Sequence, residues 1–208
     1  MKLALFDFDG TLIKKDSFIL FSIYSQKKIS VIKAYIKILP EFLLAKLGII
    51  AIERVKERLF KYLYSGIRIE QFNNLCENFI KIIDKHKNVK LLNLVEEFKR
   101  ENSKLVIVSA SISNWIEPWA REYGFNSIIA TEIEIDKNGI ITGNFKTRNC
   151  KRKEKVNRVL EKFPNIHKYE IYAFGNSKGD KEMMEFAKFS FILNRWNNNL
   201  NLINKISN

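Results

Sequence analysis

Residues 3–11 of the chain are LALFDFDGT. Four apolar residues come first, and Asp7 and Asp9 follow them with one phenylalanine between the two acids. A short apolar run bounded by a glycine is typical of a buried strand that ends in a turn. The stretch therefore predicts a strand whose carboxyl end carries two carboxylates.

This arrangement recurs along the chain. Further apolar runs occupy residues 105–108, 169–174 and 189–193, and the first two end in polar turns at 109–111 and 175–177. Four segments with helical periodicity separate the runs: 89–100, 113–123, 152–162 and 178–187. Strand, polar turn and helix in repetition predict an α/β fold with a doubly wound, mostly parallel, Rossmann-like sheet.

Two segments interrupt the alternation. Residues 132–135 and 140–143 alternate apolar and polar positions on either side of Asn138 and Gly139, which predicts a β-hairpin. Residues 14–88 contain no convincing strand, and apolar residues such as Ile32 and Ile36 recur there at helical spacing. We predict a core formed by 1–13 and 89–208, with a helical cap inserted at 14–88.

The composition excludes several classes of protein. The 208 residues are 46% apolar and 28% charged, as in a globular domain rather than a disordered chain. No stretch reaches the roughly 18 uncharged apolar residues of a spanning helix. Cys76 and Cys150 form no recognisable framework, and Met1 runs directly into the first strand without a secretory leader. The cytoplasm is the expected compartment, and Trp115, Trp119 and Trp196 are expected core aromatics.

The chain is strongly basic. Lys and Arg number 36 against 23 Asp and Glu, which gives a net charge of +13. Such a balance favours polyanionic partners, namely phosphorylated substrates, anionic lipid or nucleic acid, and compositional drift explains it equally well. Nucleic acid is not expected, because charge alone does not establish a basic face with exposed aromatics.

Polar side chains follow three of the predicted strands. Asp7 and Asp9 follow the first strand, Ser109 follows the second, and Asn176 and Asp180 follow the third. Ligands of an open α/β sheet bind beyond the carboxyl ends of its strands, so these side chains are expected to meet. A loop rich in lysine at 151–155 joins them. Carboxylates, hydroxyls and a lysine at one edge suit phosphoryl transfer assisted by Mg²⁺.

The Asp-x-Asp-Gly-Thr stretch resembles motif I of the haloacid dehalogenase superfamily. Ser109, Lys155 and residues 175–180 then resemble motifs II, III and IV, in that order. A helical cap placed directly after motif I is similar to the subclass of phosphoserine phosphatase and the bacterial phosphatidylglycerophosphate phosphatases. The resemblance covers the whole predicted core.

The chemistry assigns roles that agree with this resemblance. Asp7 is the expected nucleophile, which attacks phosphorus and forms an aspartyl-phosphate. Asp9 is the expected acid and base, which protonates the leaving alkoxide and then deprotonates water. The dehalogenases of the superfamily do not use an aspartate at that place, so Asp9 favours a phosphatase.

The remaining predicted site residues bind the phosphoryl group. Ser109 and the amide of Ala110 hold a phosphoryl oxygen, Lys155 neutralises the group, and Gly10 and Thr11 form the tight turn and supply donors. Ser109 taken alone could instead cap a helix. Lys151 and Lys153 compete with Lys155 for the role of the motif III lysine.

Mg²⁺ is the expected cofactor. The Asp7 carboxylate and the Asp9 carbonyl are predicted ligands, which cancel charge between two anions. Many superfamily members carry Asp where this chain has Asn176. An amide oxygen is a weaker ligand than a carboxylate, so either Asn176 or Asp180 completes the metal site.

The predicted cap bears on the substrate. Asp16 stands where the resemblance to phosphoserine phosphatase places a glutamate that reads the substrate, and it is the shorter acid. Residues 27–61 carry nine Lys and Arg against three acids, interleaved with apolar stretches at 42–45 and 47–50. This pattern suits an anionic membrane surface, with peripheral attachment to the inner face of the membrane. The simpler interpretation is that these apolar residues form the cap's own core.

The sequence therefore predicts an Mg²⁺-dependent phosphomonoester hydrolase that acts through an aspartyl-phosphate. Its substrate is either a small phosphorylated metabolite, such as a phosphoserine-like compound, or a lipid phosphate. The alternatives are a phosphotransferase or mutase of the same superfamily, or a basic anion-binding module with weakened catalysis. No oligomeric state follows from the sequence.

Overall fold

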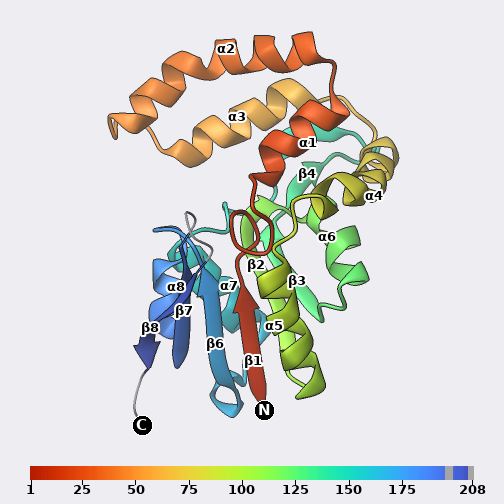
Figure 1. The fold of residues 1–208 in the computed structure, drawn as a ribbon. Helices are drawn as coiled ribbons and strands as arrows, with labels where there is room; N and C mark the ends of the chain where they lie inside the picture. Colours follow the sequence, from red (N-terminus) through yellow and green to blue (C-terminus); the bar gives the residue numbers. More distant parts are fainter. Residues whose placement is uncertain (195–198, 206–208) are drawn as a thin grey trace.

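A computed structural model describes residues 1–194 and 199–205 of the chain. Six strands form the main sheet in the order β3-β2-β1-β6-β7-β8, and all neighbours are parallel except the pair β7 and β8. The strand bounds are β1 Lys2–Phe6, β2 Lys104–Ile112, β3 Ser127–Thr131, β6 Glu170–Gly175, β7 Phe189–Leu193 and β8 Leu200–Lys205. The predicted α/β fold with a mostly parallel sheet is confirmed (Figure 1).

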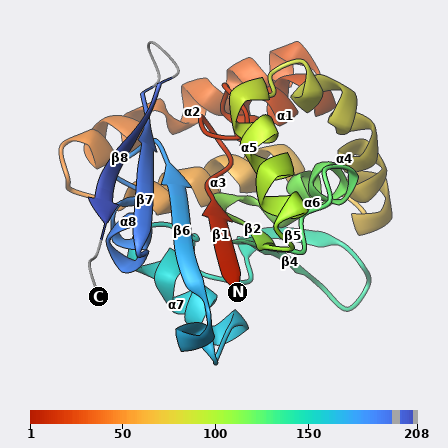
Figure 2. The same ribbon diagram turned by 60° about the horizontal axis from the view of Figure 1, so that its bottom comes forward.

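Helices cover both faces of this sheet (Figures 1 and 2). Their bounds are α5 Val89–Arg100, α6 Ser113–Glu122, α7 Lys153–Lys162 and α8 Lys181–Phe186, with a short 3-10 turn at Ile166–Lys168. Alternate residues of β1 point to opposite faces. Phe6 therefore joins one core cluster with Phe98 of α5, whereas Leu5 joins a second cluster with Val159 of α7 and Met183 of α8.

Four helices occupy the segment 14–88, and they lie beyond the carboxyl ends of the strands (Figure 1). They are α1 Ser17–Ser25, α2 Lys28–Lys46, α3 Ile52–Tyr64 and α4 Ile69–Asp84. The predicted hairpin is present as β4 Ile133–Ile135 and β5 Ile141–Phe145. Backbone hydrogen bonds join it to the end of α3, from Gly66 N to Ile141 O (2.9 Å) and from Ile141 N to Ile67 O (2.9 Å). The division into a core and a cap stays a prediction.

Several details differ from the sequence-based expectation. Strands β3 and β8 were not predicted, and β2 continues through the supposed turn at 109–111 to Ile112 by way of a β-bulge. Helix α8 begins at Lys181 rather than at residue 178. Trp115 and Trp119 are fully buried, whereas Trp196 lies outside the described residues.

The apolar face predicted for α2 is exposed rather than buried. Ile32, Ile36 and Leu39 are 44%, 65% and 51% exposed, while Ala34 and Ile38 make the contacts with the core. Of the apolar stretches at 42–45 and 47–50, only Ala45 and Ile50 pack against the core, so the interpretation of these stretches as core of the cap is largely wrong. The periodicity locates the helix correctly, but it does not identify the face that packs.

Candidate active site

Asp7 follows β1 directly, and its backbone N–H continues the sheet by donating to the Phe174 carbonyl (2.8 Å). Its side chain is buried, with Oδ1 accepting from Lys155 Nζ (2.7 Å) and Oδ2 from the Thr11 hydroxyl (3.1 Å). Burial and the nearby charge of Asp180 raise the pKa of Asp7 to about 6, against the opposing effect of Lys155. The carboxylate is thus fixed in orientation by a cation and a hydroxyl.

Lys155 lies in the first turn of α7 and is 1% exposed. Its ammonium donates to Asp7 Oδ1 (2.7 Å), to Asp180 Oδ1 (2.6 Å) and to the Val108 carbonyl (2.6 Å). Burial alone lowers the pKa of Lys155, but the two carboxylates raise it above its ordinary value. Lys151 lies 3.8 Å from Glu53 and Lys153 is exposed, so Lys155 is the lysine of this loop that reaches Asp7.

Asp180 organises the loop between β6 and α8. Its Oδ2 accepts from the backbone N–H groups of Asn176 (3.2 Å) and Ser177 (3.0 Å) and from the Ser177 hydroxyl (2.8 Å). Burial works against ionisation, but Lys155 and these donors lower the pKa of Asp180. Asn176 Nδ2 donates to the Asp9 carbonyl (2.9 Å), which joins this loop to the loop after β1.

Asp9 faces the helices rather than the sheet. Its Oδ1 accepts from the backbone N–H of Ser17 at the start of α1 (2.9 Å). Burial and the charge of Asp16 raise the pKa of Asp9 to about 7, although Lys56 opposes the shift. The two aspartates of the Asp-x-Asp motif therefore have different surroundings, Asp7 against Lys155 and Asp9 against the start of α1.

The bulge of β2 carries Ser109 and Ala110. Ser109 is buried, and its Oγ accepts from the backbone N–H of Ser111 (3.0 Å). The N-cap residue of α6 is Ile112, so Ser109 does not cap that helix and the alternative role suggested by its sequence is wrong. A bulge beside an active site reorients side chains that a regular strand would direct elsewhere.

A buried polar cluster, which the sequence did not indicate, joins α1 to this bulge. The Ser17 and Ser111 hydroxyls lie 2.7 Å apart, and Trp115 Nε1 donates to Ser17 Oγ (3.0 Å). Lys56 of α3 donates to the Ala110 carbonyl (2.8 Å), and burial lowers the pKa of this lysine although Asp9 and Asp16 oppose the shift. Lysines are frequent in 27–61, and only the packing of α3 reveals which one points into the site.

Gly10, Thr11 and Asp16 complete the set of predicted residues. Gly10 has φ of 77°, a left-handed conformation that favours glycine, and Thr11 N–H closes the turn onto the Phe8 carbonyl (3.2 Å). Asp16 is exposed and caps α1, because its Oδ1 accepts from the Ile19 N–H (3.0 Å). The structure gives Asp16 this capping role, and its predicted contact with substrate stays a prediction.

The donor atoms at this edge fit Mg²⁺. Asp7 and Asp180 supply carboxylates, Asp9 supplies a backbone carbonyl, and Asn176 lies against that carbonyl, so the available ligands include the oxygens that Mg²⁺ prefers. Within 1–194 and 199–205, no three His, Cys, Asp or Glu side chains are grouped as metal ligands. A site here would therefore combine carboxylates with carbonyl or amide oxygen.

Comparison with known proteins places this geometry in a family. A profile described as haloacid dehalogenase-like hydrolase matches residues 4–185. The chain belongs to the haloacid dehalogenase-like hydrolases. Protein CicA of Caulobacter vibrioides is 28% identical to this chain over 190 residues, which cover 89% of this chain and 82% of CicA.

Solved structures share the fold. A Bordetella pertussis Tohama I protein of unknown function aligns with a TM-score of 0.77 and 22% identity, over 91% of this chain and 88% of its own. A phospho-aspartyl intermediate analogue of phosphoserine phosphatase aligns with a TM-score of 0.62 and 18% identity, over 91% and 84%. Cytosolic 5'-nucleotidase IIIB bound to cytidine aligns with a TM-score of 0.61 and 17% identity, over 88% and 68%. At these identities the likeness concerns the fold.

Proposed function

We propose that this hydrolase cleaves phosphomonoesters in an Mg²⁺-dependent reaction that passes through an aspartyl-phosphate on Asp7. The observation that carries the proposal is the buried Lys155 ammonium, which lies within 2.7 Å of both Asp7 Oδ1 and Asp180 Oδ1. It holds the Asp7 carboxylate in place and offers a cation to phosphoryl oxygens that approach that carboxylate.

The residues divide the reaction into two displacements. The Asp7 carboxylate attacks phosphorus, the bond to the leaving oxygen breaks, and the Asp9 carboxyl gives that oxygen its proton. Asp9 then removes a proton from water, whose oxygen attacks phosphorus and frees both phosphate and the Asp7 carboxylate. The Ser109 hydroxyl donates a hydrogen bond to a phosphoryl oxygen. Mg²⁺, held by Asp7, the Asp9 carbonyl and Asn176 or Asp180, would offset the negative charge of the phosphoryl group.

The test is phosphate release with and without Mg²⁺ from phosphoserine, sugar phosphates, nucleotides and phosphatidylglycerophosphate. We expect turnover that EDTA abolishes and that the Asp7→Asn variant lacks. Unchanged turnover in Asp7→Asn contradicts the proposal. Transfer of the phosphoryl group to an added sugar, in place of phosphate release, favours the phosphotransferase. Binding of phosphate without turnover on any substrate favours the anion-binding module.

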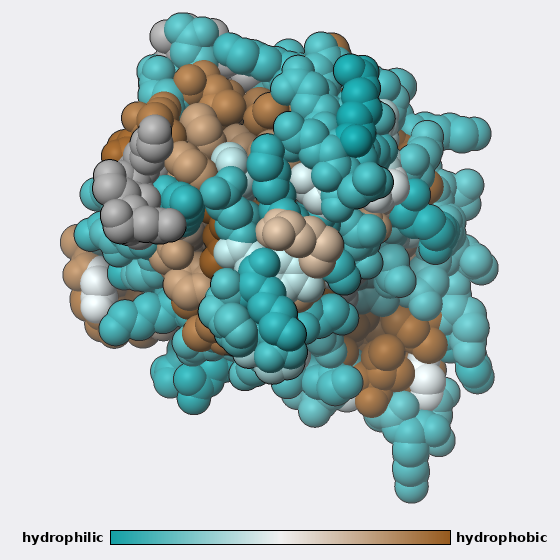
Figure 3. Space-filling model, turned by 90° about the horizontal axis from the view of Figure 1, so that it is seen from below, coloured by the Kyte–Doolittle hydropathy of each residue, from teal (hydrophilic) through white to brown (hydrophobic). Residues whose placement is uncertain are grey.

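We also propose that α2 rests on an anionic membrane surface. Its outer side carries apolar residues that are 44% to 74% exposed, together with lysines. The apolar residues are Ile29, Ile32, Ile36, Leu39, Leu43 and Leu47 at the end of the helix. By contrast, hydrophilic side chains cover most of the opposite end of the molecule, where the strands begin, and apolar ones form separate patches (Figure 3).

Apolar residues interleaved with lysines suit the interface of an anionic bilayer, which attracts the cations and accommodates the apolar side chains. In 1–194 and 199–205, none of the helices combines the length and the apolar character that crossing a bilayer demands. Attachment would therefore be peripheral.

Co-sedimentation with vesicles tests this attachment. We expect more protein to pellet with phosphatidylcholine vesicles that contain phosphatidylglycerol than with phosphatidylcholine alone. The Ile32→Asp/Leu43→Asp double variant should lose this binding. Val89→Asp should retain it, because Val89 is 57% exposed but belongs to α5. The absence of wild-type protein from both pellets contradicts the attachment.

A further inference from the structure

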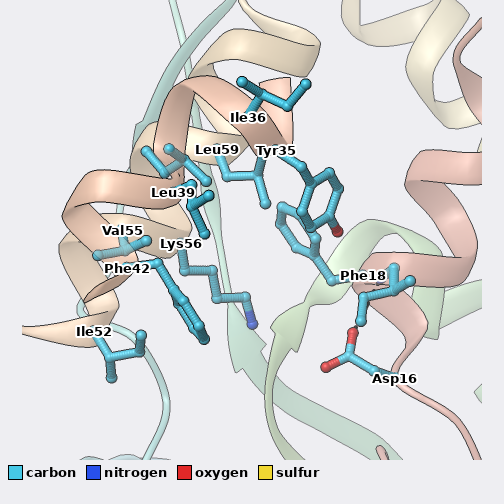
Figure 4. A pocket seen from close by; sticks show the side chains of 12 residues that line it. Asp16, Phe18, Tyr35, Ile36, Leu39, Phe42, Ile52, Val55, Lys56 and Leu59 are labelled. Atoms are coloured by element: carbon cyan, nitrogen blue, oxygen red, sulfur yellow. Dashed lines mark hydrogen bonds between the residues drawn. The ribbon is translucent and has the colours of Figure 1, made fainter. Parts of the chain in front are cut away.

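An apolar pocket of about 570 Å³ lies between α1, α2 and α3 (Figure 4). Aliphatic and aromatic side chains from all three helices line it. They include Phe18 of α1, Ile36, Leu39 and Phe42 of α2, and Val55 and Leu59 of α3. A volume of this size holds a small organic ligand, for which the usual range is about 300–1,000 Å³.

The pocket is open to the outside and polar at one end. Ile36 and Leu39 line it and are 65% and 51% exposed, so a ligand can enter beside α2. The Asp16 carboxylate and the Lys56 ammonium lie in the lower half of the view in Figure 4, on the side away from Ile36. The pocket is therefore amphipathic along its length, with an apolar entrance and a charged end.

The charged end adjoins the leaving-group side of the proposed reaction. Lys56 donates to the carbonyl of Ala110, the residue after Ser109 (2.8 Å). Asp16 precedes Ser17, whose backbone N–H donates to Asp9 Oδ1 (2.9 Å). Because Asp9 is the proposed donor of the proton to the leaving oxygen, the group attached to that oxygen must lie on the Asp9 side of Asp7.

We propose that this pocket binds an unbranched alkyl or acyl chain of the leaving alcohol, so that the substrate is an amphiphilic phosphomonoester. The inference rests on the proposed phosphatase function and adds the substrate class to it. A small polar alcohol is too short to use the apolar lining that Ile36, Leu39 and Phe42 add, whereas a chain that enters the pocket contacts that lining and loses its contact with water.

Hydrolysis of a homologous series tests the proposal. The substrates are ethyl, butyl, hexyl and octyl phosphate, each kept at concentrations where it is monomeric so that vesicle binding plays no part. Burial of each methylene should raise kcat/KM roughly threefold to fourfold until the pocket is filled. Values of kcat/KM that do not rise from ethyl to octyl phosphate overturn the proposal, while phosphate release from the whole series leaves the proposed function intact.

Two matched variants test whether the dependence of kcat/KM on chain length arises in this pocket. Leu39→Asp places a charge in the pocket and should flatten the dependence of kcat/KM on chain length. Leu44→Asp, also on α2, is the control, because Leu44 is 40% exposed but does not line the pocket. Its chain-length dependence and its hydrolysis of ethyl phosphate should match those of the wild type. A flattened dependence in both variants, or in neither, overturns the assignment to this pocket.

Calorimetry measures binding in the pocket independently of catalysis. Octyl phosphate should bind the Asp7→Asn variant at least tenfold more tightly than ethyl phosphate, with a more negative heat-capacity change. This comparison remains decisive even when no phosphomonoester is hydrolysed, which is the failure of the proposed function. Equal affinities for the two phosphates overturn the proposal whatever the enzyme hydrolyses.

Discussion

At the scale of single residues, the site depends on one lysine between two acids. Lys155 is buried and hydrogen-bonded to Asp7, Asp180 and the Val108 carbonyl, so it joins strand β2 to the loops that follow β1 and β6. Removing one partner from a buried ion pair leaves the other partner without compensation in a medium of low dielectric. Stability and catalysis should therefore depend on the same side chain.

Replacing Lys155 by Met should destabilise the fold by about 3–5 kcal/mol. Chemical denaturation measures this change, and the phosphatase assay should show no turnover. Lys153→Met is the control, because Lys153 is exposed on the same helix. The double variant Lys155→Met/Asp180→Asn should recover part of the stability but none of the activity. A Lys155→Met enzyme as stable as Lys153→Met contradicts the role given to this ion pair.

Gly175 provides the space that Asp180 occupies. A Cβ at Gly175 would lie 2.6 Å from Asp180 Cβ and 2.9 Å from its Cγ, which is closer than real contacts allow. Gly175→Ala should therefore displace the Asp180 carboxylate and lower kcat about a hundredfold, the loss typical of a misplacement near 1 Å.

Gly179→Ala is the matched control for this change. The three atoms nearest to its Cβ would be side-chain atoms of Lys151 and Ser177, at 3.3 Å. We expect kcat to fall by a few-fold at most, as measured in the same assay. If the two variants have equal kcat values, the packing of Gly175 against Asp180 is not what positions the carboxylate.

At the scale of elements, the hairpin supports the helix that carries Lys56. Gly143 of β5 has φ of 90°, and a Cβ there would lie 2.8 Å from Lys61 Cα of α3. Because that neighbour is backbone, an added methyl group must move the hairpin away from the helix.

Gly143→Ala should therefore be less stable than Gly139→Ala by about 1–3 kcal/mol, the usual cost of overpacking. Gly139 lies in the same hairpin with φ of 76°, but its Cβ would meet only Ile69 Cγ2, at 3.8 Å. Gly139→Ala thus carries the backbone strain without the clash. Urea unfolding of both variants measures the difference, and equal stabilities contradict the close packing of β5 on α3.

A second contact between elements joins α4 to α6. Lys87 Nζ donates to Asp84 Oδ2 (2.7 Å), and the Tyr123 hydroxyl donates to Asp84 Oδ1. Burial opposes the shift, but these donors lower the pKa of Asp84 below its ordinary value of 3.8. A carboxyl whose pKa is lower in the folded state stabilises the fold above its unfolded pKa, and this contribution is lost as the pH falls through the folded pKa.

The wild type should therefore be more stable than Asp84→Asn at pH 7. The difference in Tm should shrink as the pH falls below about 4, where the unfolded carboxyl is protonated. Thermal unfolding of both proteins from pH 7 to pH 2 measures it. A difference that grows as the pH falls would reverse the sign and contradict the contact.

At the scale of the whole molecule, sequence periodicity predicted the strands, helices and hairpin whose positions depend on local sequence. The strand at 3–6, the helix at 89–100 and the hairpin around Gly139 all lie where the periodicity placed them. Strand β3 was missed because its apolar part, residues 128–130, is short and is followed within three residues by the hairpin strand β4, without a glycine or proline to separate them. Strand order depends on pairing between distant segments, which periodicity does not specify.

The residues of the candidate site also divide into those that the sequence predicted and those that only the structure revealed. Asp7, Asp9, Asn176 and Asp180 follow strands and Lys155 lies in the first turn of a helix, so the fold class was enough to bring them together. Ser109 lies within β2, next to Val108, whose carbonyl accepts from Lys155. Lys56 and Ser17 enter the site from α3 and α1, and their positions depend on how these helices pack. The apolar pocket likewise required the structure, because α2 buries a different face from the one that its isoleucines indicated.

The most direct test of the account is to look for the phosphoryl group on Asp7. The Asp9→Asn variant is mixed with p-nitrophenyl phosphate, whose leaving group needs no proton, quenched in acid after a single turnover and digested for mass spectrometry. Without Asp9 to activate water, the intermediate should accumulate, and we expect phosphate on the peptide that contains Asp7. Stoichiometric release of nitrophenolate with that peptide unmodified would contradict an aspartyl-phosphate at Asp7.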